Sequence, residues 1–561
     1  MTIQTHAPGG PSRPAVPSTG ILSNLPRLVR QGESARLIVD GAAYLAIGGE
    51  LHNSTSSDPV YLARVCEQLR RSGVTTIVAT ASWAEVEPRE GSFDFKSVGE
   101  TLAVARQHGL RLVLIWFGAY KNARSTYAPT WVRADLERFP RARVGATEMQ
   151  SPFSYEGSMH KPELSVFSPA LRDADATAYR ELLRYLSKED QEHTVIMVQV
   201  ENEPGLLGGG RDRSELAMDA WNSPVPQSVL GVVQSHPEFV GSWFAECASV
   251  RSGTWAEVFG EDNRSDELFM SWGFATFVEN VAAAGKEVLP LPALVNAWLG
   301  PQPGQPLAGQ YPSGGPTSSM IPVWEALAPS IDIIAPDIYV QDSESAMRDY
   351  ARGGRTLFIP EARFRVADLF HAVARYNAIG YCAFGVEDGR PGNQFFTAST
   401  LMVSQTDAIV EAQAAGAIHS ISVGEDDRQV VKIGSYTITI HDTRALFTRV
   451  LVDAGVAAPT SRPPLELEST AGPFGPDPAE ERAFGAIVQV EEDEFLLLGC
   501  GYTVDFAHDS DIVELDHVRE LRNENGVWTE GRILNGDEHM RLVPSDGIGG
   551  SLVRLLRLTG G

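Results

Sequence analysis

The chain has 561 residues, of which 43% are hydrophobic, and a formal net charge of −26. This length exceeds one ordinary domain and suits a large barrel with an accessory module. The negative charge argues against nucleic acid as a partner, because a phosphate backbone would be repelled. No run of 18 apolar residues is present, so we expect no membrane span.

The beginning of the chain and its cysteines indicate a compartment. Residues 1–25 are rich in Pro, Gly and Ser, which predicts a flexible arm. They lack the basic and apolar regions of a signal peptide. Cys66, Cys247, Cys382 and Cys500 form no CxxC pair, so we expect free thiols in a reducing environment. The prediction is a cytoplasmic protein.

Short apolar runs alternate with helical patterns along most of the chain. A hairpin with a turn at Asp40-Gly41 leads into the first run. Eight parallel strands separated by helices predict a (β/α)8 TIM barrel, within residues 26–416. The expected strands are 44–50, 74–79, 110–117, 194–200, 290–298, 331–338, 356–360 and 380–385. The expected helices are 60–72, 98–108, 173–188, 266–284, 343–352, 366–378 and 397–415.

The barrel region is longer than the ~250 residues typical of this fold. The excess lies at 118–190 and 204–262, after the third and fourth strands, where barrel active sites are built. From residue 417 the sequence changes to short strands with Gly and Asp turns and no helix signal. We therefore predict a small all-β accessory domain over 417–561. A sugar-binding sandwich is one interpretation, and a structural or oligomerisation role is the favoured one.

Strands four and seven each end at a glutamate, Glu203 and Glu361. These strands lie nearly opposite each other in an eight-stranded barrel, so both carboxylates can face one bond. Two facing carboxylates are what cleavage of a glycosidic bond needs, and a separation of about 5–5.5 Å is typical of the retaining reaction. Strand alternation puts Gln199, Glu201 and Glu203 on one side, with Glu203 nearest the mouth. We expect Glu201 to be a deeper, structural carboxylate.

Other strand ends carry carboxylates, amides and aromatic rings. Such groups suit a sugar, whose hydroxyls need fixed partners and whose C–H faces stack on rings. No GxGxxG, P-loop or zinc-ligand spacing is present, so we expect no cofactor and no metal. The candidate substrate-binding residues are Glu50, Trp116, Asn202, Asn296, Trp298 and Tyr339.

Several ordered motifs resemble glycoside hydrolase family 35, in the bacterial β-galactosidase-like branch with a C-terminal domain of uncharacterised function. They include GGELHNS at 48–54, WAEVEPREGSFDF at 83–95, QVENEPG at 199–205, APDIY at 335–339 and PEAR at 360–363. The resemblance implies a retaining β-glycosidase with Glu203 as acid/base and Glu361 as nucleophile. It also implies that Asn202 contacts the sugar 2-hydroxyl and that Tyr339 lies near the nucleophile. Pro204 departs from the pattern, since the family commonly has Tyr there.

Three functions stay open on the sequence. The first is an exo-acting β-galactosidase-like hydrolase of oligosaccharides or glycosides. The second is a β-glucoside-active enzyme, or a transglycosylase, with the same architecture. The third, of a different class, is a sugar-binding protein on an inactive barrel. The sequence allows a homo-oligomer and carries no coiled-coil heptads that would indicate one.

Overall fold

The computed structural model describes residues 24–32, 34–121, 126–144, 163–249, 252–390, 392–423, 428–456, 471–472, 475–476 and 483–558. The predicted arm at the start of the chain lies almost wholly outside these residues. The described part opens with a three-stranded antiparallel sheet, β1 (Arg27–Gln31), β2 (Ser34–Val39) and β3 (Ala42–Tyr44). The predicted turn joins β2 to β3, with φ of 51° at Asp40 and 86° at Gly41.

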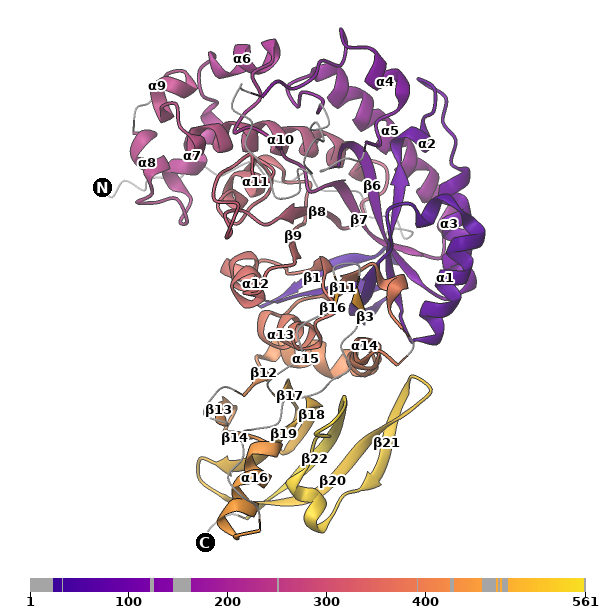
Figure 1. Cartoon of the computed structure of the whole chain (residues 1–561), viewed down its shortest axis with the longest axis vertical. Helices are drawn as coiled ribbons and strands as arrows, with labels where there is room; N and C mark the ends of the chain where they lie inside the picture. The colour runs from indigo at the N-terminus through magenta and orange to yellow at the C-terminus, as the bar shows by residue number, and fades with distance from the viewer. Residues whose placement is uncertain are drawn as a thin grey trace, which may run out of the picture.

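Eight parallel strands close into the predicted barrel (Figure 1). Around the barrel they follow chain order, and β11 pairs with β4 to complete the ring. Strand β10 begins later than expected, and β6 runs four residues further than expected. The strands are β4 (Ala46–Glu50), β5 (Thr76–Ser82), β6 (Arg111–Lys121), β7 (Val195–Asn202), β8 (Ala293–Trp298), β9 (Ile333–Ile338), β10 (Ile359–Ala362) and β11 (Gly380–Phe384).

Helices cover the outside of the barrel, and residues at their first turns favour their start. Asp58 and Ser168 accept backbone N–H bonds as N-caps, and a proline follows each cap, as is favoured at a helix start. The expected helix 397–415 is two helices, and α11 was not expected. These helices are α1 (Pro59–Arg71), α3 (Lys96–Gln107), α5 (Pro169–Glu189), α10 (Asn263–Lys286), α11 (Ile321–Leu327), α12 (Ser343–Ala351), α13 (Val366–Tyr376), α14 (Gln394–Ser404) and α15 (Thr406–Ala415).

Short helices occupy the two long segments that follow β6 and β7, and one more, α2, follows β5. Figure 1 shows α6 to α9 grouped at the end of the molecule furthest from the C-terminal strands. None of the helices among the described residues is both long and apolar enough to cross a membrane. The short helices are α2 (Trp83–Val86), α4 (Thr130–Ala134), α6 (Glu215–Trp221), α7 (Gln227–Ser235), α8 (Trp243–Cys247) and α9 (Trp255–Phe259).

The C-terminal region is mainly β and packs on α13, α14 and α15 (Figure 1). Trp528 donates to Thr400 of α14 at 3.0 Å, and the Phe484 and Phe370 ring centroids lie 5.7 Å apart. The predicted all-β domain is confirmed, with one helix that the sequence did not indicate, α16 (Thr443–Asp453), which Asp442 caps. Its strands are β12 (Ile418–Ser422), β13 (Arg428–Ile433), β14 (Tyr436–Asp442), β17 (Phe484–Glu491), β18 (Glu494–Cys500), β19 (Tyr502–His508), β20 (Ile512–Glu524), β21 (Val527–Ile533) and β22 (Gly549–Leu558), with the short pair β15 (Ala471–Gly472) and β16 (Gly475–Pro476).

The cysteines are free thiols, as predicted, and three of the four are buried. Cys382 lies in β11 and joins the apolar cluster that fills the barrel. Burial raises the pKa of the Cys66 thiol to about 12, so it stays neutral and behaves as a small apolar group. The cytoplasmic location inferred from these thiols stays a prediction.

Candidate active site

Glu203 lies directly after β7 in an unusual backbone conformation. Its φ is 45°, in the left-handed region that non-glycine residues rarely adopt. The Glu203 N–H donates to Asn296 Oδ1 at 2.7 Å. The following loop is tied to the loop after β8, since Leu206 and Ser313 exchange backbone hydrogen bonds of 2.9 and 2.8 Å. Strain of this kind persists only where the surroundings hold it, and these contacts hold Glu203.

Glu361 lies near the carboxyl end of β10, across the barrel from β7. Its strand pairs with β9 so that Glu361 is level with Asp337. Tyr339, just beyond β9, donates its phenol to Glu361 Oε1 at 2.5 Å. Glu203 and Glu361 are each 8% exposed, which is what carboxylates at a narrow barrel mouth would show.

The charges of Glu203 and Glu361 act on each other. Burial first, and then the Glu203 charge, raise the pKa of Glu361 to about 7. The Lys121 charge and the Tyr339 hydrogen bond act in the opposite direction. The tertiary structure therefore brings the two predicted catalytic residues into one electrostatic unit.

Two further carboxyl groups, Glu50 and Asp337, belong to the same cluster. Burial raises the pKa of Glu50 well above its ordinary value, and the Glu361 charge raises it further. Burial followed by the Glu361 and Glu203 charges does the same to the pKa of Asp337. Like charges this close cannot all be ionised. Among Glu50, Asp337 and Glu361, it is Glu361, which accepts the Tyr339 phenol, that ionises most readily.

Asn296 and Asn202 lie in the site and contact each other. Asn296 Nδ2 donates to Asp337 Oδ2 at 2.8 Å and to Asn202 Oδ1 at 3.4 Å. Its Oδ1 accepts from Glu203 N, so its amide is used within the protein. Asn296 thus positions other groups of the site, and the substrate contact predicted for it stays a prediction. Asn202 Nδ2 is buried without a partner among the described residues.

Glu201 is structural, as predicted, but it does not share the side of Glu203. Its φ is 64°, which breaks the strand alternation on which that expectation rested. The carboxylate accepts from Ala119 N at 3.2 Å and Tyr120 N at 2.7 Å, in an irregular part of β6. It also hydrogen-bonds the Asp175 carboxyl on α5, so it faces the helix layer.

Trp116 does not line the site, and that prediction is wrong. It packs with Leu112 and Leu114 in the layer between barrel and helices, whereas Val113 and Phe117 belong to the barrel interior. Its indole donates to Asp175 Oδ1 at 2.7 Å, and the side chain is fully buried. Strand alternation puts Trp116 on the outer face with Leu112 and Leu114, and because β6 continues to Lys121, Trp116 lies mid-strand and not at the rim.

The remaining candidate, Trp298, lies at the rim of the site, and two residues that were given no role, Asp337 and Lys121, also act on the site. Trp298 is partly exposed, is level with Asp337 across β8 and β9, and donates to Gln305 Oε1 at 3.3 Å. Asp337 and Lys121 are the missed residues. Both stand at strand ends, which was the available signal, but neither matched a motif that assigned it a role.

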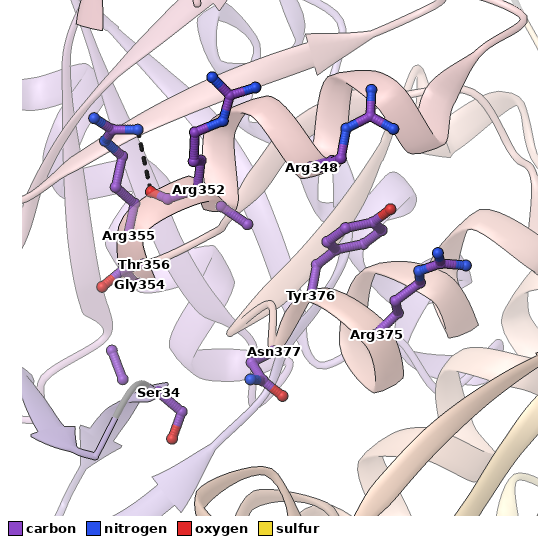
Figure 2. Close-up of a pocket in the computed structure, with 11 residues that line it drawn as sticks. Ser34, Arg348, Arg352, Gly354, Arg355, Thr356, Arg375, Tyr376 and Asn377 are labelled. Carbon is purple, nitrogen blue, oxygen red and sulfur yellow. Dashed lines mark hydrogen bonds between the residues drawn. The ribbon is translucent and has the colours of Figure 1, made fainter. Parts of the chain in front are cut away.

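A cavity of about 270 Å³ lies away from this cluster (Figure 2). Its lining residues precede β10 and β11, so it opens at the amino-terminal end of the barrel. Arg355 pairs there with Glu238 at 2.7 Å and Glu325 at 2.8 Å. Arg352 pairs with Asp349 at 3.0 Å. The guanidinium groups in Figure 2 do not converge on one point, and these ion pairs are structural.

The described residues contain no group of three or more His, Cys, Asp or Glu arranged to hold a metal ion. His52, at the rim, hydrogen-bonds Asp388 at 2.8 Å, and its backbone N–H donates to Glu387 at 3.0 Å. It is thus part of the contact between the loops after β4 and β11. A closed barrel with two carboxylates at its strand ends is an arrangement that glycoside hydrolases use.

Two family models match the chain. Residues 58–224 match the model Glyco_hydro_42, described as beta-galactosidase. Residues 398–543 match a domain of unknown function, DUF5597. The first match makes this part of the barrel similar to a family of glycosidases. It supports the predicted family only at that level, because the model is of family 42 and not of family 35. A search of curated proteins finds no match.

Solved structures that match include three β-galactosidases. The enzyme from the psychrophilic Marinomonas ef1 is 12% identical, with a TM-score of 0.41, over 65% of this chain and 60% of that one. The enzyme from Halorubrum lacusprofundi is 13% identical, with a TM-score of 0.42, over 65% of this chain and 58% of that one. A catalytic mutant of a GH42 enzyme from G. stearothermophilus is 10% identical, with a TM-score of 0.47, over 91% of this chain and 98% of that one. The chain thus spans about 60% of the first two relatives.

Proposed function

We propose that the protein is an exo-acting, retaining β-glycosidase of the β-galactosidase type. The observation that carries this proposal is the buried pair Glu203 and Glu361 at the ends of β7 and β10, with the Tyr339 phenol on Glu361. Retaining enzymes need one carboxylate as nucleophile and a second as acid and then base. The match to a β-galactosidase model over 58–224 supports the sugar class.

In the first step, ionised Glu361 attacks the anomeric carbon and forms a bond to the sugar. Protonated Glu203 gives its proton to the glycosidic oxygen, and the bond to the aglycone breaks. The Tyr339 hydrogen bond keeps Glu361 oriented and favours its charged form. The Lys121 charge also favours ionised Glu361.

In the second step, Glu203 removes a proton from water, whose oxygen attacks the anomeric carbon. The bond to Glu361 breaks and the sugar leaves with its original configuration. Formation of the covalent intermediate removes the charge of Glu361. Because that charge favours the protonated form of its neighbours, its loss helps Glu203 to act as a base.

Groups with unused hydrogen-bonding capacity are suited to bind the sugar. Asn202 Nδ2 and Glu50 Oε2 are buried without partners among the described residues, so a sugar hydroxyl would satisfy them. In this proposal Asn202 contacts the sugar 2-hydroxyl, as the resemblance to family 35 implies. The partly exposed ring of Trp298 offers an apolar face to the sugar C–H groups.

A panel of p-nitrophenyl α- and β-glycosides tests the proposal. We expect turnover of the β-galactoside and no turnover of α-glycosides, with the β-anomer as the first product in proton NMR. Faster turnover of the β-glucoside would mean that the preferred sugar is glucose and not galactose. Products longer than the substrate, formed with an added acceptor, would indicate a transglycosylase. Sugar binding without turnover on the whole panel would reject an enzyme.

Azide distinguishes the two carboxylates. With Glu361→Gly, azide in place of the nucleophile should give a glycosyl azide of inverted configuration. With Glu203→Ala, azide should attack the covalent intermediate and give an azide of retained configuration. The opposite pattern would exchange the two roles. Membership of family 35 is part of this proposal and rests on the motifs at 48–54, 83–95, 199–205, 335–339 and 360–363.

A further inference from the structure

Asp337 is a deeply buried member of the carboxyl cluster, held between two neighbouring strands. It is 3% exposed and lies on β9 between Trp298 of β8 and Glu361 of β10. Its Oδ2 accepts from Asn296 Nδ2 at 2.8 Å. The orientation of this amide follows from its other end, because Asn296 Oδ1 accepts the Glu203 N–H and an NH₂ group could not.

The second oxygen of Asp337 has a different environment. Among the described residues no donor reaches Oδ1, although it is buried. The Asp337 side chain also forms a hydrogen bond with the Glu203 side chain. Two carboxyl groups can share a hydrogen bond only if one of them carries a proton. A proton on Asp337 would give Oδ1 an acceptor and end its lack of a partner.

The charges around Asp337 favour that location of the proton. The carboxylates of Glu361, Glu203 and Glu50 all act against a charge on Asp337. Asp337 is also more buried than Glu203, which is 8% exposed, so ionising it costs more desolvation energy. A carboxylic acid held neutral in this way can act as a hydrogen-bond donor.

We propose that Asp337 is a neutral carboxylic acid whose O–H donates to Glu203, and that it is a positioning residue for the acid/base step. This inference rests on the proposed function. Asp337 keeps its proton throughout, and Glu203 alone exchanges protons with the leaving oxygen and with water. The hydrogen bond strengthens when Glu203 becomes an anion, because bonds to charged acceptors are stronger. It therefore helps Glu203 to release its proton.

The test compares Asp337→Asn with Asp337→Ala. Asparagine can still accept from Asn296 and can donate its NH₂ group to Glu203, so the proposed bonds survive. Alanine removes both. We expect Asp337→Asn to keep kcat/KM within about threefold on a phenyl β-glycoside. We expect Asp337→Ala to lose about 10²-fold, in the range of general acid catalysis.

The leaving group separates positioning of Glu203 from general damage. A 2,4-dinitrophenolate leaves without protonation, so we expect Asp337→Ala to lose less than about tenfold on that glycoside. Asp368→Ala is the control, since Asp368 is an equally buried aspartate on α13 that bonds Ser343. It should reduce thermal stability without dependence on the leaving group.

A pH profile gives a second readout. Loss of a donor to the ionised acid raises the pKa of Glu203, so the alkaline limb of kcat/KM should move to higher pH in Asp337→Ala and stay in Asp337→Asn. Charged and titratable groups facing Asp337 are Glu50 of β4, Glu203, Glu361, Tyr339 and Tyr350. Lys121 of β6 acts on Glu50 and Glu361 in the same cluster. All are unchanged in both variants.

Three results would overturn the inference. They are full activity of Asp337→Ala, equal losses on both leaving groups, and an Asp337→Asn variant as inactive as Asp337→Ala. The last would mean that an ionised aspartate is required. If the wild-type protein turns over neither glycoside, the proposed function fails instead, so the two failures are distinguishable.

Discussion

Strand β7 separates two clusters of buried carboxyl groups that differ in how their oxygens are satisfied. On the helix side, Glu201 accepts two backbone N–H groups. Asp175 accepts an indole N–H and a backbone N–H, at 2.7 and 2.8 Å. On the barrel side, Glu50 Oε2 and Asp337 Oδ1 have no partner among the described residues. Burial and raised pKa values are common to both clusters, so they do not identify a catalytic site by themselves. Unused hydrogen-bonding capacity beside Glu203 and Glu361 distinguishes the barrel-side cluster, because a substrate can supply the missing partners.

The largest expected effect is a difference between two Glu→Gln substitutions, one in the barrel-side cluster and one in the helix-side cluster. Glu361→Gln should lose at least about 10³-fold in kcat, since an amide is no nucleophile, and should leave the melting temperature unchanged or raise it. Glu201→Gln should keep most of the activity. Assays on an aryl β-glycoside with parallel thermal melts make the measurement, and similar activity losses in both would remove the distinction between the clusters.

Glu203→Gln is expected to lose about 10²- to 10⁴-fold on a glycoside with a poor leaving group. The glutamine cannot protonate the leaving oxygen, while Glu361 can still attack. A dinitrophenyl glycoside should therefore retain a much larger share of the wild-type rate. Equal losses on both substrates would argue against Glu203 as the acid.

The helix-side cluster should respond in stability. Glu201→Ala leaves the Tyr120 N–H without its acceptor and removes one acceptor of the Ala119 N–H. We expect a loss of about 2–4 kcal/mol in the free energy of unfolding, measured by urea denaturation. Glu201→Gln is the matched control, because its amide can accept one N–H and donate to Asp175, and it should cost less. Equal stability of the alanine variant and the wild type would contradict a structural role.

The barrel-side cluster should respond to pH. Protonation removes the nucleophile, so kcat/KM should fall as the pH drops through about 7, where Glu361 titrates. Tyr339→Phe removes a donor to the charged form, which raises the pKa of Glu361 and moves this acid limb to higher pH. If the acid limb of kcat/KM does not move in Tyr339→Phe, Tyr339 does not affect the ionisation of Glu361.

The same raised pKa has a consequence for stability. Because folding favours protonated Glu361, its contribution is fully present below the ordinary value of 4.5 and is lost as the pH rises through about 7. Glu361→Gln should remove this fall. Denaturation midpoints at pH 5 and pH 8 for both proteins make the comparison, and identical pH dependence would contradict it.

The smallest effect is expected at the amino-terminal end of the barrel. Arg348 lines the cavity in Figure 2, and its contact with Asp349 at 3.8 Å is exposed. Arg348→Ala should change the free energy of unfolding by less than about 1 kcal/mol and leave kcat/KM unchanged. A clear loss of activity would give this cavity a part in function.

Local sequence patterns predicted most of the barrel because each strand and helix is defined by its own periodicity. The ends were less predictable, since pairing with neighbours decides where a strand stops. β6 runs to Lys121, so Trp116, which was expected at the rim, lies mid-strand, and strand alternation puts it on the outer face. α16 was missed for a similar reason, as its start depends on Asp442, whose cap is recognisable only once the turn is formed.

The sequence by itself determined the eight strands and the two glutamates that end the fourth and the seventh. Tertiary structure alone decided which way each carboxyl faces and where protons reside. The positive φ values at Glu201 and Glu203 are set by contacts with β6 and with Asn296 of β8. The raised pKa values of Asp337 and Glu361 come from burial and from charges on other strands. Such effects depend on distances between residues far apart in the chain, and local patterns do not encode those distances.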